Sequence, residues 1–258
     1  MSDAVREFME YYNFLCELFK RDLKKKYYKS VLGVLWTLLN PLLMMTVMTI
    51  VFSTLFRRSI DHYPAYYMCA YVVMVFNSVT TTQSLNCIVN NSGLVRKLRV
   101  PNYMFCLATV ALNMLTMLLS LIPLLLVALA TGVQLTPYVL LLPVPLVLTA
   151  GFTAGLSLTL SVVGVFFRDM AYLYSIVTTI WTYVTPMFYP ISMIPVQYRF
   201  LWELNPMYHY VSLMRSLVLY GQMPSEKTLL IATAYAVLLL LTGAMVFRKN
   251  QDRLYLHL

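Results

Sequence analysis

The chain has 258 residues, of which 60% are hydrophobic and 11% are charged, and its mean hydropathy is +0.72. A soluble domain carries about 25% charged residues, so 19 basic and 10 acidic side chains are too few to cover a soluble surface. The charges are also clustered, and five charge-free segments separate them: 30–56, 62–95, 100–167, 170–198 and 228–247. Because a membrane-spanning helix needs about 20 apolar residues, the sequence predicts an all-α integral membrane protein.

The first predicted domain is an amphipathic helix over residues 1–29. Apolar residues recur there at spacings of three and four, as on one face of a helix: Val5, Phe8, Met9, Tyr12, Cys16, Phe19 and Leu23. We expect this helix to lie along the membrane surface, with Lys24, Lys25 and Lys26 at the lipid headgroups. Acidic residues scattered through it exclude a signal peptide. A solvated cytoplasmic tail is the alternative, which the Phe and Tyr content disfavours.

The second predicted domain, 30–258, is the transmembrane domain. It contains six predicted transmembrane helices: 31–56, 66–89, 103–130, 139–167, 172–188 and 229–247. The longest charge-free segment holds two of them, because Gly, Gln and Pro mark a turn at 131–137. A short basic amphipathic segment, 92–101, lies between the second and third helices. Segment 187–226 holds four prolines and much apolar sequence, which argues against a solvated loop.

The orientation follows from counting basic residues on alternate sides of the membrane. Five fall on one side: Arg57, Arg58, Arg199, Arg215 and Lys227. The other fourteen fall on the side of both termini, in 1–29, 96–99, 168 and 248–253, which places the termini in the cytoplasm. The net charge of +9 reflects this bias and attraction to anionic lipid, so a nucleic-acid partner is disfavoured. Tyr63, Tyr66 and Tyr67 are expected to be headgroup-level anchors.

Residues that carry catalysis or bind metals and cofactors are sparse. The four cysteines form no close pair, and the three histidines lack the spacing of metal ligands. The predicted spans hold almost no ionisable residue, although proton-coupled carriers usually need one. None of the eight glycines lies in a phosphate-binding loop of the G-x-x-x-x-G-K-[ST] type. The sequence therefore predicts no catalytic residue, no metal site and no cofactor in this chain, and energy for transport from another subunit.

Four motifs in chain order are specific. The first is R-D-L-K-x-x-Y-x-x-S-x-L-G-x-L-W-x-x-L-x-P at 21–41, where a basic cluster runs into the first span. The others are L-V-R-K-L-R-V-P at 94–101, F-F-R-D at 166–169, and F-Y-P at 188–190 followed by N-P-M at 205–207. Together they resemble the membrane subunits of polysaccharide-exporting ABC transporters, which include O-antigen, capsule and teichoic acid permeases with an ABC type-2 transmembrane domain. The resemblance covers nearly the whole chain.

The resemblance implies a homodimer in the bacterial cytoplasmic membrane, with two ATP-binding-cassette ATPase subunits that bind ATP and Mg. The cargo is then a lipid-linked polysaccharide. Segment 92–101 resembles the coupling helix that sits in a cleft of the ATPase. Leu94 and Val95 would pack into the cleft, and Arg96, Lys97 and Arg99 would pair with acidic groups. Arg168 and Asp169 would add a second contact or an internal ion pair. The alternative is that the three cations only set topology.

The first and fifth spans are expected to line the translocation path. Trp36, Thr37 and Asn40 belong to the first, and Tyr172, Ser175, Thr179 and Tyr183 form one stripe on the fifth. Aromatic rings stack on sugar faces, and hydroxyls exchange hydrogen bonds with a sliding glycan. These stripes are equally typical of helix-packing faces. The close glycines Gly151 and Gly155 are expected to allow close approach of helices within the subunit.

Segment 187–226 resembles the two re-entrant helices of the family, which would form a lid over the channel exit. Tyr189, Asn205, Pro206 and Arg215 are its candidate functional residues, with Asn205 and Pro206 between the two helices. Two other functions stay open: an ABC permease that exports a drug or lipid, and a non-transporting membrane scaffold for glycan synthesis. A membrane enzyme is disfavoured because the acids and bases are missing.

Overall fold

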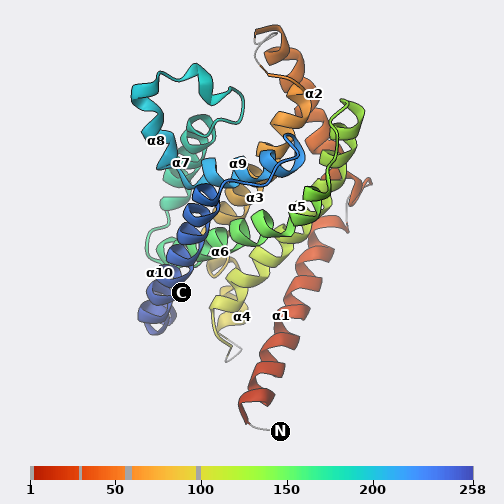
Figure 1. Ribbon diagram of the computed structural model, residues 1–258. Coiled ribbons are helices and arrows are strands. Elements are labelled where there is room, and N and C mark those ends of the chain that lie inside the picture. The colour runs from red at the N-terminus through yellow and green to blue at the C-terminus, as the bar shows by residue number, and fades with distance from the viewer. Residues whose placement is uncertain (1–2, 29–30, 56–59, 97–99, 258) are drawn as a thin grey trace.

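The computed structural model describes residues 3–28, 31–55, 60–96 and 100–257 (Figure 1). Within these residues every regular element is helical. The α-helices are α1 (Asp3–Tyr27), α2 (Leu35–Leu55), α3 (Tyr63–Leu85), α4 (Ser92–Val95), α5 (Tyr103–Ala130), α6 (Pro143–Phe166), α7 (Met170–Val184), α8 (Arg199–Glu203), α9 (Pro206–Val218) and α10 (Glu226–His257). Short 3₁₀ helices are η1 (Val89–Asn91), η2 (Pro137–Leu141), η3 (Ile191–Met193) and η4 (Val196–Tyr198).

The predicted all-α membrane fold is confirmed, but the predicted number of spans is not. Among the described residues, α2, α5, α10 and the η2–α6 segment are long and apolar enough to cross a bilayer. A fifth span is obtained when α3 is joined to η1 and α4 across a bend of 57°. The helix expected over 172–188 is α7, which has 15 residues. That is about 22 Å of helix, less than the ~30 Å thickness of the hydrocarbon core.

The core of the bundle is built around α3 and α9. Large side chains of both helices are fully buried, including Tyr67, Met68 and Met74 of α3 and Met207, Tyr210 and Met214 of α9. Helices α5, α6 and α10 pack around them. Helix α9 therefore lies in the interior of the chain, although it belongs to the segment for which an external lid was expected. In contrast, only 6% of the residues of α2 between Leu35 and Phe52 are buried, against 44% for α5.

Helices α6 and α10 form the most extensive helix pair, and glycines bring them together. A Cβ atom built at Gly155 would overlap the backbone of Leu239, and one built at Gly243 would overlap the backbone of Gly155. Gly151 faces the side chains of Leu240 and Ala236 in the same interface. The expected close approach within the subunit is confirmed. In lipid, where no hydrophobic force drives helices together, such contact is the main source of association.

Helix α1 packs against α5 along the lower part of the bundle (Figure 1). The packed stripe consists of Tyr11, Phe14, Leu15 and Leu18, of which Leu18 is 3% exposed. This is not the predicted apolar stripe, because Tyr12 on that stripe is exposed. The helix expected over 1–29 thus has a second apolar face, which the periodicity analysis missed. The side chains of Val5, Phe8 and Met9 lie outside the described part of α1.

The tyrosines expected at headgroup level lie inside the chain. Tyr63, Tyr66 and Tyr67 are all buried at the start of α3. Their rings pack on one another and on Phe188, with the Tyr63 and Tyr66 ring centroids 6.4 Å apart and those of Tyr67 and Phe188 5.9 Å apart. The prediction of lipid anchors was therefore wrong for these three. The segment at 187–189 folds back over α3 and covers them.

Candidate functional site

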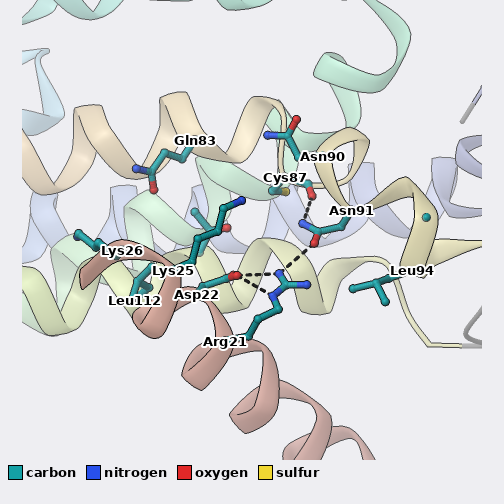
Figure 2. A pocket seen from close by; sticks show the side chains of 12 residues that line it. Arg21, Asp22, Lys25, Lys26, Gln83, Cys87, Asn90, Asn91, Leu94 and Leu112 are labelled. Carbon is teal, nitrogen blue, oxygen red and sulfur yellow. Dashed lines mark hydrogen bonds and ion pairs between the residues drawn. The ribbon is translucent and has the colours of Figure 1, made fainter. Parts of the chain in front are cut away.

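A cavity of about 660 Å³ lies between α1, the end of α3, η1, α4 and α5. Its lining includes three cations of α1, one carboxylate and three side-chain amides: Arg21, Lys25, Lys26, Asp22, Gln83, Asn90 and Asn91. We call it the basic cavity (Figure 2). The signals that could have found it are the R-D-L-K start of the first motif and the amides inside the second charge-free segment.

Arg21 is held in a fixed orientation at this cavity. Its guanidinium lies 2.7 Å from the carboxylate of Asp22 and donates to Asn91 Oδ1 at 2.9 Å (Figure 2). Asn91 in turn donates from Nδ2 to the carbonyl of Cys87 at 2.7 Å. Arg21, Asp22 and Lys25 follow Leu18 at spacings of three and four, so they continue the packed face of α1. Lys25 therefore lines the basic cavity with an exposed side chain.

Lys26 marks the boundary between this cavity and a second one. Its ammonium donates to Thr116 Oγ1 of α5 at 2.8 Å, and burial lowers the pKa of Lys26. Asn113 of α5 donates to Gln83 Oε1 of α3 at 2.8 Å at the same level. The second cavity holds about 300 Å³ between α2, α3 and α5. Lys26, Trp36, Thr37 and Asn40 line it together with many apolar side chains, and we call it the apolar cavity.

The start of α2 is shaped by the Leu-Gly pair of the first motif. Gly33 has a φ of +47°, a conformation that side chains other than glycine rarely adopt. The turn is closed by a hydrogen bond from the amide of Leu35 to the carbonyl of Leu32, at 2.9 Å. This turn ends the connection from α1 and presents Trp36 to the apolar cavity. The glycine of this motif is therefore explained by the backbone conformation of the turn that precedes α2.

The segment predicted to be the coupling helix is only partly described. Helix α4 ends at Val95, shorter than the expected 92–101, and Lys97 and Arg99 lie outside the described residues. Val95 is 2% exposed and packs in a cluster with residues of α5, α6 and α10. Leu94 is half-buried, and Arg96 is exposed at the end of α4. The side chain of Val95 thus faces the chain itself, whereas Arg96 is exposed to the outside.

The turn between α6 and α7, predicted to be cytoplasmic, contains Arg168 and Asp169. Both side chains are exposed, and they form no ion pair with each other in the described part of the chain. Asp169 lies at the N-terminus of α7 and accepts backbone hydrogen bonds there through its carbonyl. Neither side chain forms an ion pair with another residue that the structure describes.

The two predicted channel stripes do not meet within one chain. On α7, Tyr172 and Tyr183 are 77% and 65% exposed, and Ser175 and Thr179 are exposed between them. The Ser175 and Thr179 hydroxyls donate to carbonyls of their own helix, to Tyr172 at 2.6 Å and to Ser175 at 2.8 Å. On α2 the predicted residues line the apolar cavity instead. Apolar residues flank the α7 stripe: Leu173, Ile176, Val177 and Ile180.

Asn205 organises the region after α7. Its side chain accepts from the amide of Met207 at 3.0 Å and from Trp181 Nε1 at 2.8 Å, and its amide donates to Thr185 Oγ1 at 2.9 Å. It is thereby the N-cap of α9, with Pro206 at the first helical position, as is typical of helix starts. Tyr189 donates from its hydroxyl to the carbonyls of Tyr183 and Val184, both at 3.0 Å.

Arg215 of α9 is a buried cation, 6% exposed. Its guanidinium lies 3.4 Å from the centroid of the Tyr66 ring and donates to the carbonyls of Tyr66 at 3.4 Å and Met187 at 3.5 Å. It therefore ties α9 to α3 and to the segment after α7. Together these side chains can bind a ligand or hold helices in contact. Among the described residues, no group of three His, Cys, Asp or Glu side chains could hold a metal ion.

The chain is similar to a known protein family and to several named transport proteins. Residues 14–219 match the ABC-2 type transporter family. The chain is 29% identical to the Myxococcus xanthus O-antigen export system permease protein RfbA over 254 residues, 98% of each chain. It is 26% identical to the protein of the same name from Klebsiella pneumoniae, over 94% of this chain and 93% of that one. It is 24% identical to the Escherichia coli polysialic acid transport protein KpsM, over 91% and 92%. With most of its length matched, this chain belongs to the ABC-2 type transporter family.

Proposed function

We propose that this chain is the permease subunit of an ATP-driven transporter that exports a lipid-linked polysaccharide across the bacterial cytoplasmic membrane. The observation that carries the proposal is similarity over at least 91% of the chain to relatives named for O-antigen export and for polysialic acid transport. ATP and Mg would be bound by a partner ATPase. The glycan would pass between two copies of this chain.

The dimer is supported by the surfaces that one copy leaves uncovered. Helix α2 is mostly unburied in its own chain, and α7 exposes a continuous mixed face of aromatic, hydroxyl and aliphatic side chains. If α2 and α7 of two copies face each other, the aliphatic residues cover one another. The stripe with Tyr172 and Tyr183 then borders a path between the copies.

Six crossings and cytoplasmic termini belong to the same proposal. The bent α3–α4 segment would be the second crossing, and α7 with the buried residues 185–188 would be the fifth. In Figure 1, α4 and the C-terminal part of α10 lie toward the end at which α1 begins, and α8 lies toward the opposite end. This arrangement supports a cytoplasmic side with α1, α4 and the end of α10, where most basic residues lie. Helices α8 and α9 would then form the outer, re-entrant region.

The coupling contact is assigned to the exposed side of α4. Leu94 and Arg96 would meet the ATPase, with Arg168 or Asp169 as a second contact. Charge reversal by Arg96→Glu is expected to lower the amount of ATPase that copurifies. If no ATPase copurifies with the wild-type chain and Arg96→Glu has no effect, the scaffold function is favoured instead.

The cargo is tested by glycan export in cells that lack their own copy of the gene. Tyr183→Ala removes an aromatic ring from the α7 stripe and is expected to reduce surface glycan without changing the amount of permease in the membrane. The control is Tyr198→Ala, another exposed tyrosine, which lies in η4 outside the stripe. Equal export by the two variants would contradict the path along α7. If the wild-type chain exports a drug or a free lipid but no polymer, the proposal of a polysaccharide cargo is contradicted.

A further inference from the structure

The basic cavity and the apolar cavity share a boundary. Lys26 lines both, and its hydrogen bond to Thr116 lies where α1 crosses α5. Gln83 lines the basic cavity and Asn113 lines the apolar cavity, and the hydrogen bond between them joins α3 to α5 at this boundary. One elongated ligand that contacts Lys26 could therefore occupy both spaces.

The chemistry changes sharply across that boundary. In the basic cavity, Arg21, Lys25 and Lys26 oppose a single carboxylate, that of Asp22, so the lining has two excess positive charges. Lys25 has no acidic partner among the residues that the structure describes. Beyond Lys26 the lining is mainly aliphatic and aromatic: Trp36, Pro41, Val72, Val75, Phe76, Val79 and Met117. A cationic space next to an apolar one matches a molecule with an anionic head and a hydrocarbon tail.

Both cavities lie between helices of one chain. Their linings come from α1, α2, α3, α4 and α5 and the short segments that join them, and α7 contributes no residue to either. The site is thus separate from the α7 stripe proposed for the glycan. Arg21 is already oriented by Asp22 and Asn91, which suits a ligand that stays in place better than one that slides through.

We propose that the two cavities bind one resident anionic phospholipid of the cytoplasmic leaflet. Its phosphate lies among Arg21, Lys25 and Lys26, and one acyl chain runs along the apolar cavity between α2 and α5. Basic pockets between membrane helices on the cytoplasmic side bind anionic lipid headgroups in this way, and guanidinium and ammonium groups form charge-assisted hydrogen bonds with phosphate oxygens. The placement of the site at the cytoplasmic leaflet rests on the orientation proposed above, but not on the identity of the cargo.

Such a lipid would join α1 and α2, which pack on the bundle separately and contact each other little. Helix α2 is largely unburied, and the apolar cavity separates it from α3 and α5 near its N-terminal end. An acyl chain in this cavity supplies the missing contacts, and the headgroup holds the C-terminal end of α1 in place. The bound phospholipid is therefore expected to stabilise the α1–α2 region against dissociation from the bundle.

The test is native mass spectrometry of the full-length permease, purified in a mild detergent with whatever subunits accompany it. After delipidation, phosphatidylglycerol or phosphatidylcholine is titrated back. We expect one retained phosphatidylglycerol per chain and weaker binding of phosphatidylcholine. Lys25→Gln is expected to weaken phosphatidylglycerol binding about fivefold, because one basic residue is removed from an anionic headgroup. Val79→Trp, which fills the apolar cavity from an exposed position of α3, is expected to abolish binding.

Two matched controls distinguish the site from general attraction to lipid. Lys24→Gln removes the same charge from the neighbouring residue, which lines neither cavity, and Leu126→Trp adds the same ring at an exposed α5 position outside them. Both are expected to bind like the wild type. The proposal is overturned if Lys25→Gln and Lys24→Gln bind alike, if inorganic phosphate alone displaces the lipid, or if the retained molecule is an isoprenoid phosphate. It is also overturned if an accompanying ATPase excludes the lipid.

This test separates the lipid site from the transport function. A chain that exports glycan normally but retains no phospholipid would refute the site and leave the function intact. A chain that retains the phospholipid but exports no glycan would refute the proposed transport function and leave the lipid site intact.

Discussion

At the scale of single residues, Arg215 illustrates how much its environment differs from what its position in the sequence suggests. The counting of basic residues treats it as a cation on the outer side of the membrane. In the fold it is buried against the Tyr66 ring and two backbone carbonyls, and it has no acidic partner in the described chain. A planar guanidinium can stack on the ring and donate to both carbonyls at once, which an ammonium cannot do.

We therefore expect Arg215→Lys to destabilise the chain more than Arg215→Met does. A lysine at this position is still a buried charge, but it loses the stacking on the Tyr66 ring and the several N–H donors of the guanidinium. Methionine removes the charge and fills much of the space. The measurement is the apparent melting temperature of the purified permease in detergent. Arg199→Lys is the control, because Arg199 also donates to carbonyls but is only half-buried. A melting temperature unchanged by Arg215→Lys would show that the cation alone is sufficient.

Other residues show where sequence reasoning succeeds and where it cannot. The Asn205-Pro206 pair can be interpreted directly, because an N-cap and a proline at the first helical position are local features. The burial of Tyr66 cannot be interpreted in this way. It depends on the segment at 186–189, more than a hundred residues away, whose carbonyls accept from the Tyr66 hydroxyl. The periodicity of α3 carries no information about that contact.

At the scale of helices, α1 shows that one amphipathic helix can have two apolar stripes with different partners. Tyr11, Phe14, Leu15 and Leu18 contact the bundle, while Tyr12 on the predicted stripe stays exposed. A partly exposed apolar stripe beside a packed one suits a helix that lies between protein and lipid. A period of three and four identifies each stripe, but it does not say which one faces the protein.

The α6–α10 pair depends on close contact, which gives a second prediction. Gly155→Ala places a methyl group in the space occupied by the Leu239 backbone, so the helices must separate. We expect a destabilisation of about 1–3 kcal/mol, as is typical of overpacking. Gly93→Ala is the matched control, because nothing lies within 4 Å of a Cβ at Gly93. Thermal unfolding of the two purified variants measures the difference, and equal melting temperatures would contradict the tight contact.

The short helices are the elements that the sequence predicted least well. Segment 92–101 was expected to be one coupling helix, but the described helix α4 has four residues and directs Val95 inward. The same alternation of apolar and basic residues is compatible with a helix that faces a partner protein and with a turn that packs on its own chain. Tertiary contacts with α5 and α10 decide between these possibilities, and they are not visible in the local pattern.

At the scale of the whole molecule, the proposed dimer places α2 of one copy near α7 of the other. We expect a chain with Val47→Cys and Ile176→Cys, both exposed positions on these helices, to form a covalent dimer with a bis-maleimide reagent. Cys16 is replaced by Ser for this experiment, since the other native cysteines are buried. The readout is the fraction of dimer on a denaturing gel after treatment of intact membranes.

The control for this experiment replaces Ile176→Cys with Leu126→Cys, an exposed position of α5. That pair is expected to remain monomeric, because α5 is not part of the proposed interface. Equal cross-linking of both pairs would indicate random collision in the membrane. Dimer formation by neither pair would contradict the proposed facing of α2 and α7.

The composition is sufficient to predict an all-α membrane protein with several spans, because a bilayer accepts few other solutions. It is not sufficient to count the spans or to place the cavities. Helix α7 is too short to qualify by length, α3 qualifies only with its bent continuation, and the basic cavity joins residues of α1 to amides about 60 to 70 positions later. These features arise from how the helices pack, which the charge-free segments do not specify.

The glycine contacts also bear on how force would travel through the molecule. Gly164 lies against the backbone of Leu85 at the end of α3, and Gly155 lies against the backbone of α10. Because these contacts are so close, α3, α6 and α10 are expected to move little relative to one another. Helix α4 follows α3 after a few residues. A push applied at α4 would therefore displace these three helices as one stiff body. The relative motion would be taken up at α2, the candidate span with the smallest buried share in its own chain.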